Sequence, residues 1–230
     1  MTDIATPDFG ITVYSDIACP WAHVAVHRLH RAIDERGMEH EIQIDHRAFP
    51  LEVVNGRPTP KDVLDAELPA CAELAPDAGW SFDPEPWTYP VSTMPALEAV
   101  QAAKEQGAHA SARLDRALRV AMFRYWRCLA VLAVVEEVAA TVDGIDVDRL
   151  RSTIRSGSAR SDLWHHVDEA DELRIPGSPT FVLSDGTTSH NPGIDFHWED
   201  EPGRSLVIDA DEPDAIAGLV DATIALRPAD

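Results

Sequence analysis

The sequence predicts an α/β fold in which a helical domain is inserted between the two halves of a sheet-containing domain. A strand–helix–strand pattern fills the first fifty residues, a proline-rich and then helical stretch follows, and a helix, two short strands and a last helix close the chain. We therefore divide the 230 residues into a first half at 1–50, an inserted all-helical domain at 51–158 and a second half at 159–230.

The first half has the pattern of a βαβ unit. Residues 11–14 are an uncharged run of β-branched and aromatic residues, as in a buried strand. Residues 21–36 have helical apolar spacing, and Gly37 suits the end of that helix. Residues 41–49 alternate between apolar and polar and predict a second strand. A helix between two such strands predicts that the strands are parallel.

The insertion begins where the composition changes. Nine of the 17 prolines lie between positions 50 and 95, which predicts an irregular stretch with a few short helices. Helical spacing returns from Pro95 to about residue 106. A second helix is expected over 112–142, and because it is apolar on most sides we expect it to be buried.

The second half begins with an expected helix over 159–173. Two strand-like runs at 180–184 and 187–190 flank Asp185-Gly186, which is a strong hairpin signal. A last helix is expected over 213–226. The order is therefore βαβ, helical insertion, αββα.

The composition excludes several classes of function. A net charge of −21 leaves no basic surface for phosphates, so we expect no nucleic-acid partner. Residues 1–10 have no signal-peptide pattern, and the longest apolar run, 128–135, is too short to cross a bilayer. Three cysteines, an odd number, indicate reduced thiols. We expect a cytoplasmic protein with no membrane partner, and the oligomeric state stays open.

Cys19 is the candidate catalytic residue. It stands between the first strand and the first helix, where unpaired N–H groups and the positive end of the helix dipole favour a thiolate. We therefore expect a lowered pKa for Cys19. Pro20 suits the first helical turn because it has no N–H, and Trp21 offers an apolar wall beside the sulfur.

Ala22 stands where a Cys-x-x-Cys oxidoreductase has its second cysteine. A disulfide cycle within this motif is therefore excluded, and single-thiol chemistry remains, through a mixed disulfide that a small thiol resolves. Cys71 and Cys128 are weighed as resolving thiols against ordinary buried cysteines.

Histidines on the first helix raise a metal hypothesis. Cys19, His23 and His27 are four residues apart and lie on one side of the helix, but no fourth ligand is evident. We expect no metal. His23 is instead a candidate to stabilise the thiolate or to exchange protons with the substrate.

Three short motifs carry a family resemblance. They are Asp16-x-x-Cys19-Pro20-Trp21 between a strand and a helix, Gly177-Ser178-Pro179-Thr180-Phe181, and Ser92-Thr93 before a helix of the insertion. The first resembles the active-site start of DsbA-like proteins, in particular the FrnE-like branch. The second is similar to the Gly-x-Pro-Thr-Phe segment of that superfamily, and the third to the Asn-Thr pair of FrnE-like relatives.

The resemblance implies a thioredoxin-like fold with a helical insertion and a cis peptide bond at Pro179, beside Cys19. Such a bond would leave the backbone of Ser178 free to pair with an extended substrate. Ser92 and Thr93 become candidate contacts for a substrate or thiol. Asn191, which follows the second hairpin strand, is another.

Three functions stay open. The first is a thiol–disulfide oxidoreductase-like enzyme that acts through Cys19 alone on a small thiol or disulfide-containing substrate. The second is a glutathione-dependent isomerase or transferase, because hydroxychromene-carboxylate isomerases and kappa-class glutathione transferases are similar in architecture, although they typically have a serine at this position. The third is a non-catalytic binding module. We expect no bound cofactor, and glutathione or another small thiol as a cosubstrate.

Overall fold

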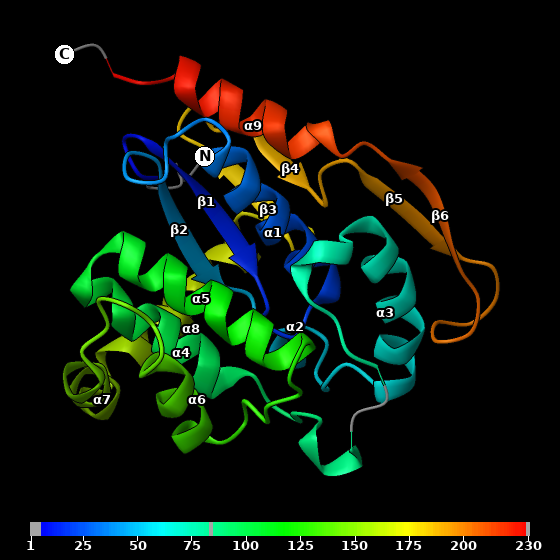
Figure 1. Ribbon diagram of the computed structural model, residues 1–230, viewed down its shortest axis with the longest axis horizontal. Helices are drawn as coiled ribbons and strands as arrows, with labels where there is room; N and C mark the ends of the chain where they lie inside the picture. The colour runs from blue at the N-terminus through cyan, green and yellow to red at the C-terminus, as the bar shows by residue number, and fades with distance from the viewer. Residues whose placement is uncertain (1–5, 83–84, 229–230) are drawn as a thin grey trace.

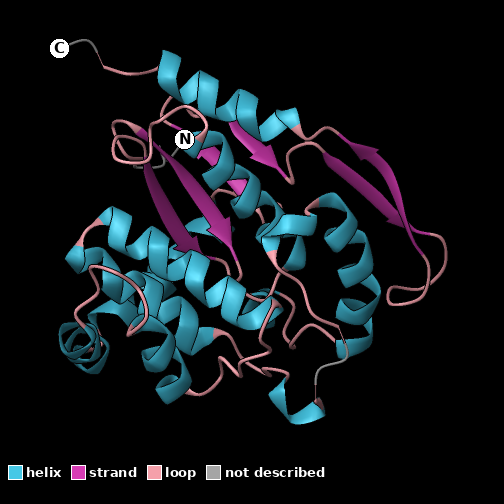
Figure 2. Cartoon of the chain, in the orientation of Figure 1, coloured by secondary structure: helices cyan, strands magenta, loops and turns pink. Residues whose placement is uncertain are grey.

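The computed structural model describes residues 6–82 and 85–228. Met1–Ala5, which belong to the segment where no signal peptide is expected, lie outside the described residues. The strands are β1 Gly10–Ser15, β2 Gln43–Ala48, β3 Thr180–Leu183, β4 Thr188–His190, β5 Ile194–Trp198 and β6 Leu206–Asp211. The α-helices are α1 Pro20–Asp34, α2 Leu51–Val54, α3 Lys61–Leu74, α4 Met94–Ala103, α5 Ala108–Phe123, α6 Leu132–Ala139, α7 Val147–Ser156, α8 Ser158–Glu172 and α9 Asp214–Ala225. Short 3₁₀ turns are η1 Pro76–Ala78, η2 Pro86–Thr88 and η3 Lys104–Gln106. Figure 2 shows how helices and strands are distributed.

A four-stranded sheet in the order β2-β1-β3-β4 forms the centre of the fold. As expected, β1 and β2 are parallel, whereas β3 runs antiparallel to β1 and β4 antiparallel to β3. Because side chains alternate along a strand, Val13 and Phe181 pack toward α1 and α9, while Tyr14 and Val182 pack toward α8. The sheet is therefore covered by helices on both faces. Strand β1 lies in the interior of the sheet and is followed by the loop that leads to Cys19 at the start of α1.

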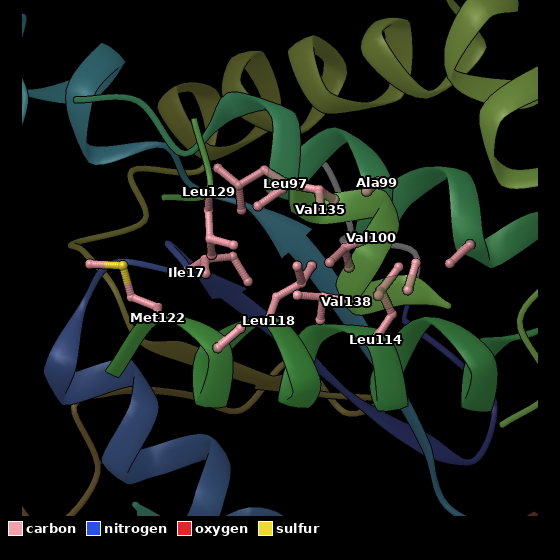
Figure 3. Close-up of a cluster of buried hydrophobic side chains, with 14 of the residues drawn as sticks. Ile17, Leu97, Ala99, Val100, Leu114, Leu118, Met122, Leu129, Val135 and Val138 are labelled. Carbon is pink, nitrogen blue, oxygen red and sulfur yellow. The ribbon is translucent and has the colours of Figure 1, made fainter. Parts of the chain in front are cut away.

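The helices α4 to α8 share a second buried core, gathered to one side of the sheet (Figures 1 and 3). Ile17, from the loop between β1 and α1, packs into this core and ties that loop to the insertion. Helix α8 joins both parts, because Leu163 belongs to the insertion's core and Ala170 to a cluster with Tyr14 of the sheet. The division at 158/159 therefore stays a prediction.

The single helix expected over 112–142 is wrong. The chain forms α5, turns over 124–131 and then forms α6. Trp126 stands in this turn with φ 47° in the left-handed region, and its indole donates a 2.9 Å hydrogen bond to the Ser81 carbonyl. Both helices pack into one core, so the apolar pattern continues across the break, and no glycine or proline in the turn marks it.

The hairpin of β5 and β6 is absent from the sequence prediction, which places no element between the strand at 187–190 and the helix at 213–226. Most positions in its strands are half-buried or exposed, β6 begins with three half-buried residues in a row, and the strands contain several acidic residues, so the alternation that indicates a strand is weak. Phe196, Leu206 and Ile208 pack from this hairpin against the cluster around Trp21 and Cys71. The hairpin runs beside α3, a fourteen-residue helix where only short helices were expected.

In the described ranges, no helix is both long and apolar enough to cross a membrane.

Candidate functional site

Cys19 is the N-cap residue of α1, and the structure brings it to the second motif of the sequence. Its thiol donates a hydrogen bond to the Ser178 carbonyl, with an Sγ–O distance of 3.3 Å. The Ser178–Pro179 peptide bond is cis, the geometry that the family resemblance implies. The Asp16 amide in turn donates to Ser178 Oγ at 3.0 Å. Two loops about 160 positions apart in the chain therefore form one site.

The Cys19 thiol is neutral in this arrangement. Its side chain is only 2% exposed, and burial raises its pKa to about 12, although the Ala22 amide favours the thiolate. The nearby acids Glu67 and Asp16 raise the pKa further. The expected lowering of the pKa is therefore wrong, because the cost of desolvating a thiolate outweighs the favourable helix end.

A buried carboxylate, Asp16, holds the loop that leads to Cys19. One oxygen accepts hydrogen bonds from the Ala18 amide at 2.9 Å and the Thr93 hydroxyl at 2.8 Å, and the other accepts from the Leu51 amide at 2.7 Å. Burial raises the pKa of Asp16, and these donors oppose that shift. Asp16 thereby ties the loop to α2 and to the start of α4.

Arg119 of α5 holds the same loop from the insertion. Its guanidinium, 1% exposed, donates to the Asp16 carbonyl at 2.9 Å and to the Ser15 hydroxyl at 2.8 Å. It also forms an ion pair with buried Asp115 at 2.6 Å. The arginine satisfies three groups that would otherwise be buried without partners.

A pocket of about 470 Å³ opens at Cys19, which lines it together with Trp21, Arg57, Glu67, Ser178 and Phe196. The Trp21 ring stacks on Phe196 with centroids 4.1 Å apart and planes 7° apart. The Trp21 indole also donates a 3.0 Å hydrogen bond to Glu67 Oε1. The apolar wall expected from Trp21 is thus one side of a built pocket of a size that holds small molecules.

Arg57, Glu67 and Phe196 of this pocket were not predicted from the sequence, and Glu67 is the acid among them. It lies on α3, where burial raises its pKa to about 7, against the smaller opposing effect of the Trp21 hydrogen bond. The signal in the sequence was weak: a carboxylate in line with Leu64, Leu68 and Cys71 on the buried face of a helix that was not predicted.

The other two cysteines differ in their surroundings. Cys71 is fully buried in the same cluster as Cys19 and Ala22, whereas Cys128 is half-buried in the turn between α5 and α6. All three thiols are free. Ala22 is fully buried, so no second thiol stands three residues after Cys19.

The two histidines of α1 have separate environments. His23 stacks on Phe123 with centroids 4.8 Å apart and meets the edge of Trp80, and burial lowers its pKa to about 3. His27 pairs with Asp77 at 3.1 Å. Neither ring lines the pocket at Cys19. Among the described residues no three potential metal ligands lie together.

The three candidate contacts, Ser92, Thr93 and Asn191, do not line this pocket either. Ser92 donates to Glu52 at 2.6 Å, and Thr93 is the buried donor to Asp16. Asn191, at φ 44°, donates its backbone N–H to the Pro179 carbonyl at 2.9 Å and so holds the loop that contains Ser178. Thr93 and Asn191 therefore hold the two loops of the site without lining the pocket: Thr93 holds the loop of Cys19, and Asn191 holds the loop of Ser178.

Solved structures show the same fold at low sequence identity. A probable DsbA oxidoreductase from Streptomyces coelicolor is 17% identical, with 96% of this chain and 92% of that chain covered and a TM-score of 0.61. The cytosolic disulfide reductase DsbM from Pseudomonas aeruginosa with GSH is 17% identical, with 94% and 99% covered and a TM-score of 0.53. A 2-hydroxychromene-2-carboxylate isomerase is 18% identical, with 78% and 87% covered and a TM-score of 0.54.

Among proteins of curated function, none matches the sequence significantly. The sequence itself matches a protein family over residues 10–219, which include both halves of the sheet, the insertion and the two loops that meet at Cys19. The chain therefore belongs to the DSBA-like thioredoxin domain family.

Proposed function

We propose that this protein is a thiol–disulfide oxidoreductase-type enzyme that acts through Cys19 alone and uses glutathione or another small thiol as cosubstrate. The observation that carries the proposal is the placement of the Cys19 sulfur at a pocket, 3.3 Å from the Ser178 carbonyl, with Ala22 three residues later. The site keeps the attacking thiol and lacks the partner that would release a mixed disulfide within the motif. A small thiol is needed for that step.

The reaction has two exchanges. Cys19 attacks a sulfur of the substrate disulfide, so that the substrate bond breaks, one substrate sulfur leaves as a thiol, and Cys19 becomes a mixed disulfide. A small thiol then attacks this mixed disulfide, forms a new disulfide with the bound sulfur and returns Cys19 to the thiol. The small thiol supplies the electrons, and the proton of Cys19 moves to the departing sulfur.

The surroundings of this chemistry belong to the same proposal. All three cysteines are free, and the structural neighbour DsbM is described as a cytosolic disulfide reductase with GSH. We place the protein in the reducing cytoplasm, with small thiols and disulfide-containing substrates as partners and no bound cofactor. The net charge of −21 supports the absence of nucleic-acid and anionic membrane partners.

A glutathione-dependent isomerase or transferase is a second candidate, because the Cys19 thiol is buried and holds its proton. A neutral S–H that points at the Ser178 carbonyl can turn to donate a hydrogen bond to the thiolate of a bound cosubstrate. In that case Cys19 forms no covalent bond.

Incubation with oxidised glutathione, followed by tryptic digestion and mass spectrometry, separates the candidates. The proposal predicts a glutathione adduct on the peptide that contains Cys19 and ends at Arg28, lost in Cys19→Ser and kept in the control Cys128→Ser. Saturable glutathione binding by calorimetry without an adduct would favour the isomerase or transferase. If neither an adduct nor glutathione binding is observed, both enzymatic candidates are contradicted and a non-catalytic binding module is favoured.

A further inference from the structure

Glu67 is a buried acid in the same pocket as Cys19. It is 9% exposed and lines the pocket from α3, across from the start of α1. Among the described residues, the Trp21 indole is its hydrogen-bond donor, at 3.0 Å, and no cation forms an ion pair with it. A carboxylate with so little compensation is costly to bury, and such groups concentrate at functional sites.

Cys19 needs a proton acceptor because its buried thiol is neutral. A thiol attacks a disulfide as the thiolate, so the proton must leave Sγ during the attack. Asp16 is the other acid near Cys19, but both of its oxygens already accept hydrogen bonds from Ala18, Leu51 and Thr93. Glu67 accepts one hydrogen bond, from Trp21, and lines the pocket, so it is the acid that is able to take the proton of Cys19.

We propose that Glu67 takes the proton of the Cys19 thiol as the thiol attacks and passes it to the sulfur that leaves. The proposal deepens the proposed function and rests on it. In the first exchange the S–S bond of the substrate breaks, the bond from Cys19 to the substrate sulfur forms, and the departing thiolate takes the proton from Glu67. In the second exchange, the small thiol gives its proton to Glu67, which returns it to Cys19.

Burial among α1, α3 and the adjoining loops lets Glu67 titrate in the neutral range. Burial raises its pKa to about 7, near the optimum for a group that both takes and gives a proton. The titratable groups facing this region from α1, α3 and the adjoining loops are Cys19, Asp16, Cys71, Tyr89 and Arg57. Burial holds the pKa values of the thiols and of Tyr89 above their usual range, so these groups stay protonated near pH 7, and burial also raises the pKa of Asp16, whose oxygens are held by three donors.

Charge and proton transfer predict opposite effects of Glu67→Gln. The negative charge of Glu67 raises the pKa of Cys19, so its removal would speed the reaction if charge were its whole influence. If Glu67 accepts the proton, the same change slows the reaction. Glutamine keeps the size of the side chain and an oxygen that accepts from Trp21, so the variant isolates the acid.

The test is the rate of Cys19 alkylation by iodoacetamide between pH 5 and 9, followed by mass spectrometry of its tryptic peptide. In the wild type we expect the rate to rise about fivefold from pH 6 to 7 and to flatten above pH 8, as the ionised fraction of Glu67 does. In Glu67→Gln we expect the flattening to disappear and the rate at pH 7 to fall about 10- to 100-fold. In Trp21→Phe the midpoint moves above pH 7, because the carboxylate loses its donor.

The fully buried Cys71 is an internal control for folding, since its alkylation rises only if a variant opens. Protected Cys71 together with a Glu67→Gln rate equal to or above that of the wild type would overturn the proposal, as would a wild-type profile that keeps rising tenfold per pH unit. Alkylation involves no disulfide exchange. A flattened profile without a glutathione adduct would therefore leave the role of Glu67 intact and remove the proposed function.

Discussion

The loop that carries Cys19 is held from two sides of very different chemistry. On the side of the insertion, Arg119 and Thr93 donate hydrogen bonds to the loop, and the arginine is paired with Asp115. On the side of α3 and the β5–β6 hairpin, the contact is an aromatic stack of Trp21 on Phe196 and one hydrogen bond to Glu67. The first side is a satisfied polar network, and the second is an apolar wall with one poorly compensated acid.

This difference separates support from reactivity. Loop backbone is costly to bury unless its polar groups find partners, and the insertion supplies those partners. The wall of α3 and β5 forms the pocket beside the sulfur and contains the group with a pKa near neutrality. We therefore expect changes on the insertion side to alter stability first and changes on the α3 side to alter the behaviour of Cys19 first.

The largest expected effect is that of Arg119→Leu. The variant removes the donors to Ser15 and Asp16 and leaves Asp115 buried without its cation, so we expect a loss of about 3 to 5 kcal/mol in the free energy of unfolding. Urea denaturation followed by far-UV circular dichroism measures it. Arg151→Leu, which removes solvent-exposed ion pairs to Glu136 and Asp148, is the control and should leave the free energy of unfolding close to that of the wild type. Equal losses in the two variants would contradict the distinction between the two sides.

The second prediction concerns the pH dependence of stability. On the insertion side burial lowers the pKa of His23, and on the α3 side burial raises the pKa of Glu67, so the two groups change stability with pH in opposite directions. Burial lowers the pKa of His23 to about 3, so below pH 6.5 the unfolded chain binds more protons than the folded one and stability falls as the pH falls. Burial raises the pKa of Glu67 to about 7, so between pH 7 and 4.5 the folded chain binds more protons and stability rises as the pH falls. Each group contributes a slope of about 1.4 kcal/mol per pH unit.

Urea unfolding at several pH values between 4.5 and 6.5 measures these slopes. We expect His23→Phe to lessen the loss of stability toward low pH and Glu67→Gln to increase it, each by roughly 1 kcal/mol per pH unit. His30 and His166, whose pKa values burial also lowers to about 3, maintain a positive dependence of stability on pH in every variant. The same slope in the wild type and both variants would show that neither side titrates as described.

The smallest expected effect is that of Phe196→Leu. Leucine keeps an apolar side chain against Trp21 but loses the ring stack, so we expect a cost of about 0.5 to 1.5 kcal/mol in the free energy of unfolding. Phe196 also lines the pocket, and the smaller leucine blocks less of the approach to the sulfur, so alkylation of Cys19 should become faster. Mass spectrometry of samples quenched at successive times measures that rate. Phe82→Leu, the same exchange at a ring that is 50% exposed, should leave both quantities close to wild type. An unchanged alkylation rate of Cys19 in Phe196→Leu would show that Phe196 does not limit the access of the reagent to the sulfur.

The parts of the site that were predictable from sequence have strong local signals. Cys19 follows a short apolar strand and precedes a proline at the first position of a helix, and these features lie within a few residues of one another. The hairpin of β3 and β4 was predictable from Asp185-Gly186 for the same reason. The hairpin of β5 and β6 and the break between α5 and α6 were not, because partial burial and a shared core conceal their periodicity.

The sequence by itself determined the order of the elements that form the central sheet, the position of Cys19 at a helix start and the absence of a second cysteine at Ala22, since these depend only on neighbours along the chain. The tertiary structure alone decided that Cys19 is buried and neutral and that Arg119, Glu67 and Phe196 surround it, whereas its meeting with the Ser178–Pro179 loop was already expected from the family resemblance. These residues come from separate helices and strands, and no local pattern encodes which of them will meet. Desolvation acts through that assembled surface, so the protonation of the thiol follows from the packing of α3 and β5 against α1 rather than from the motif around it.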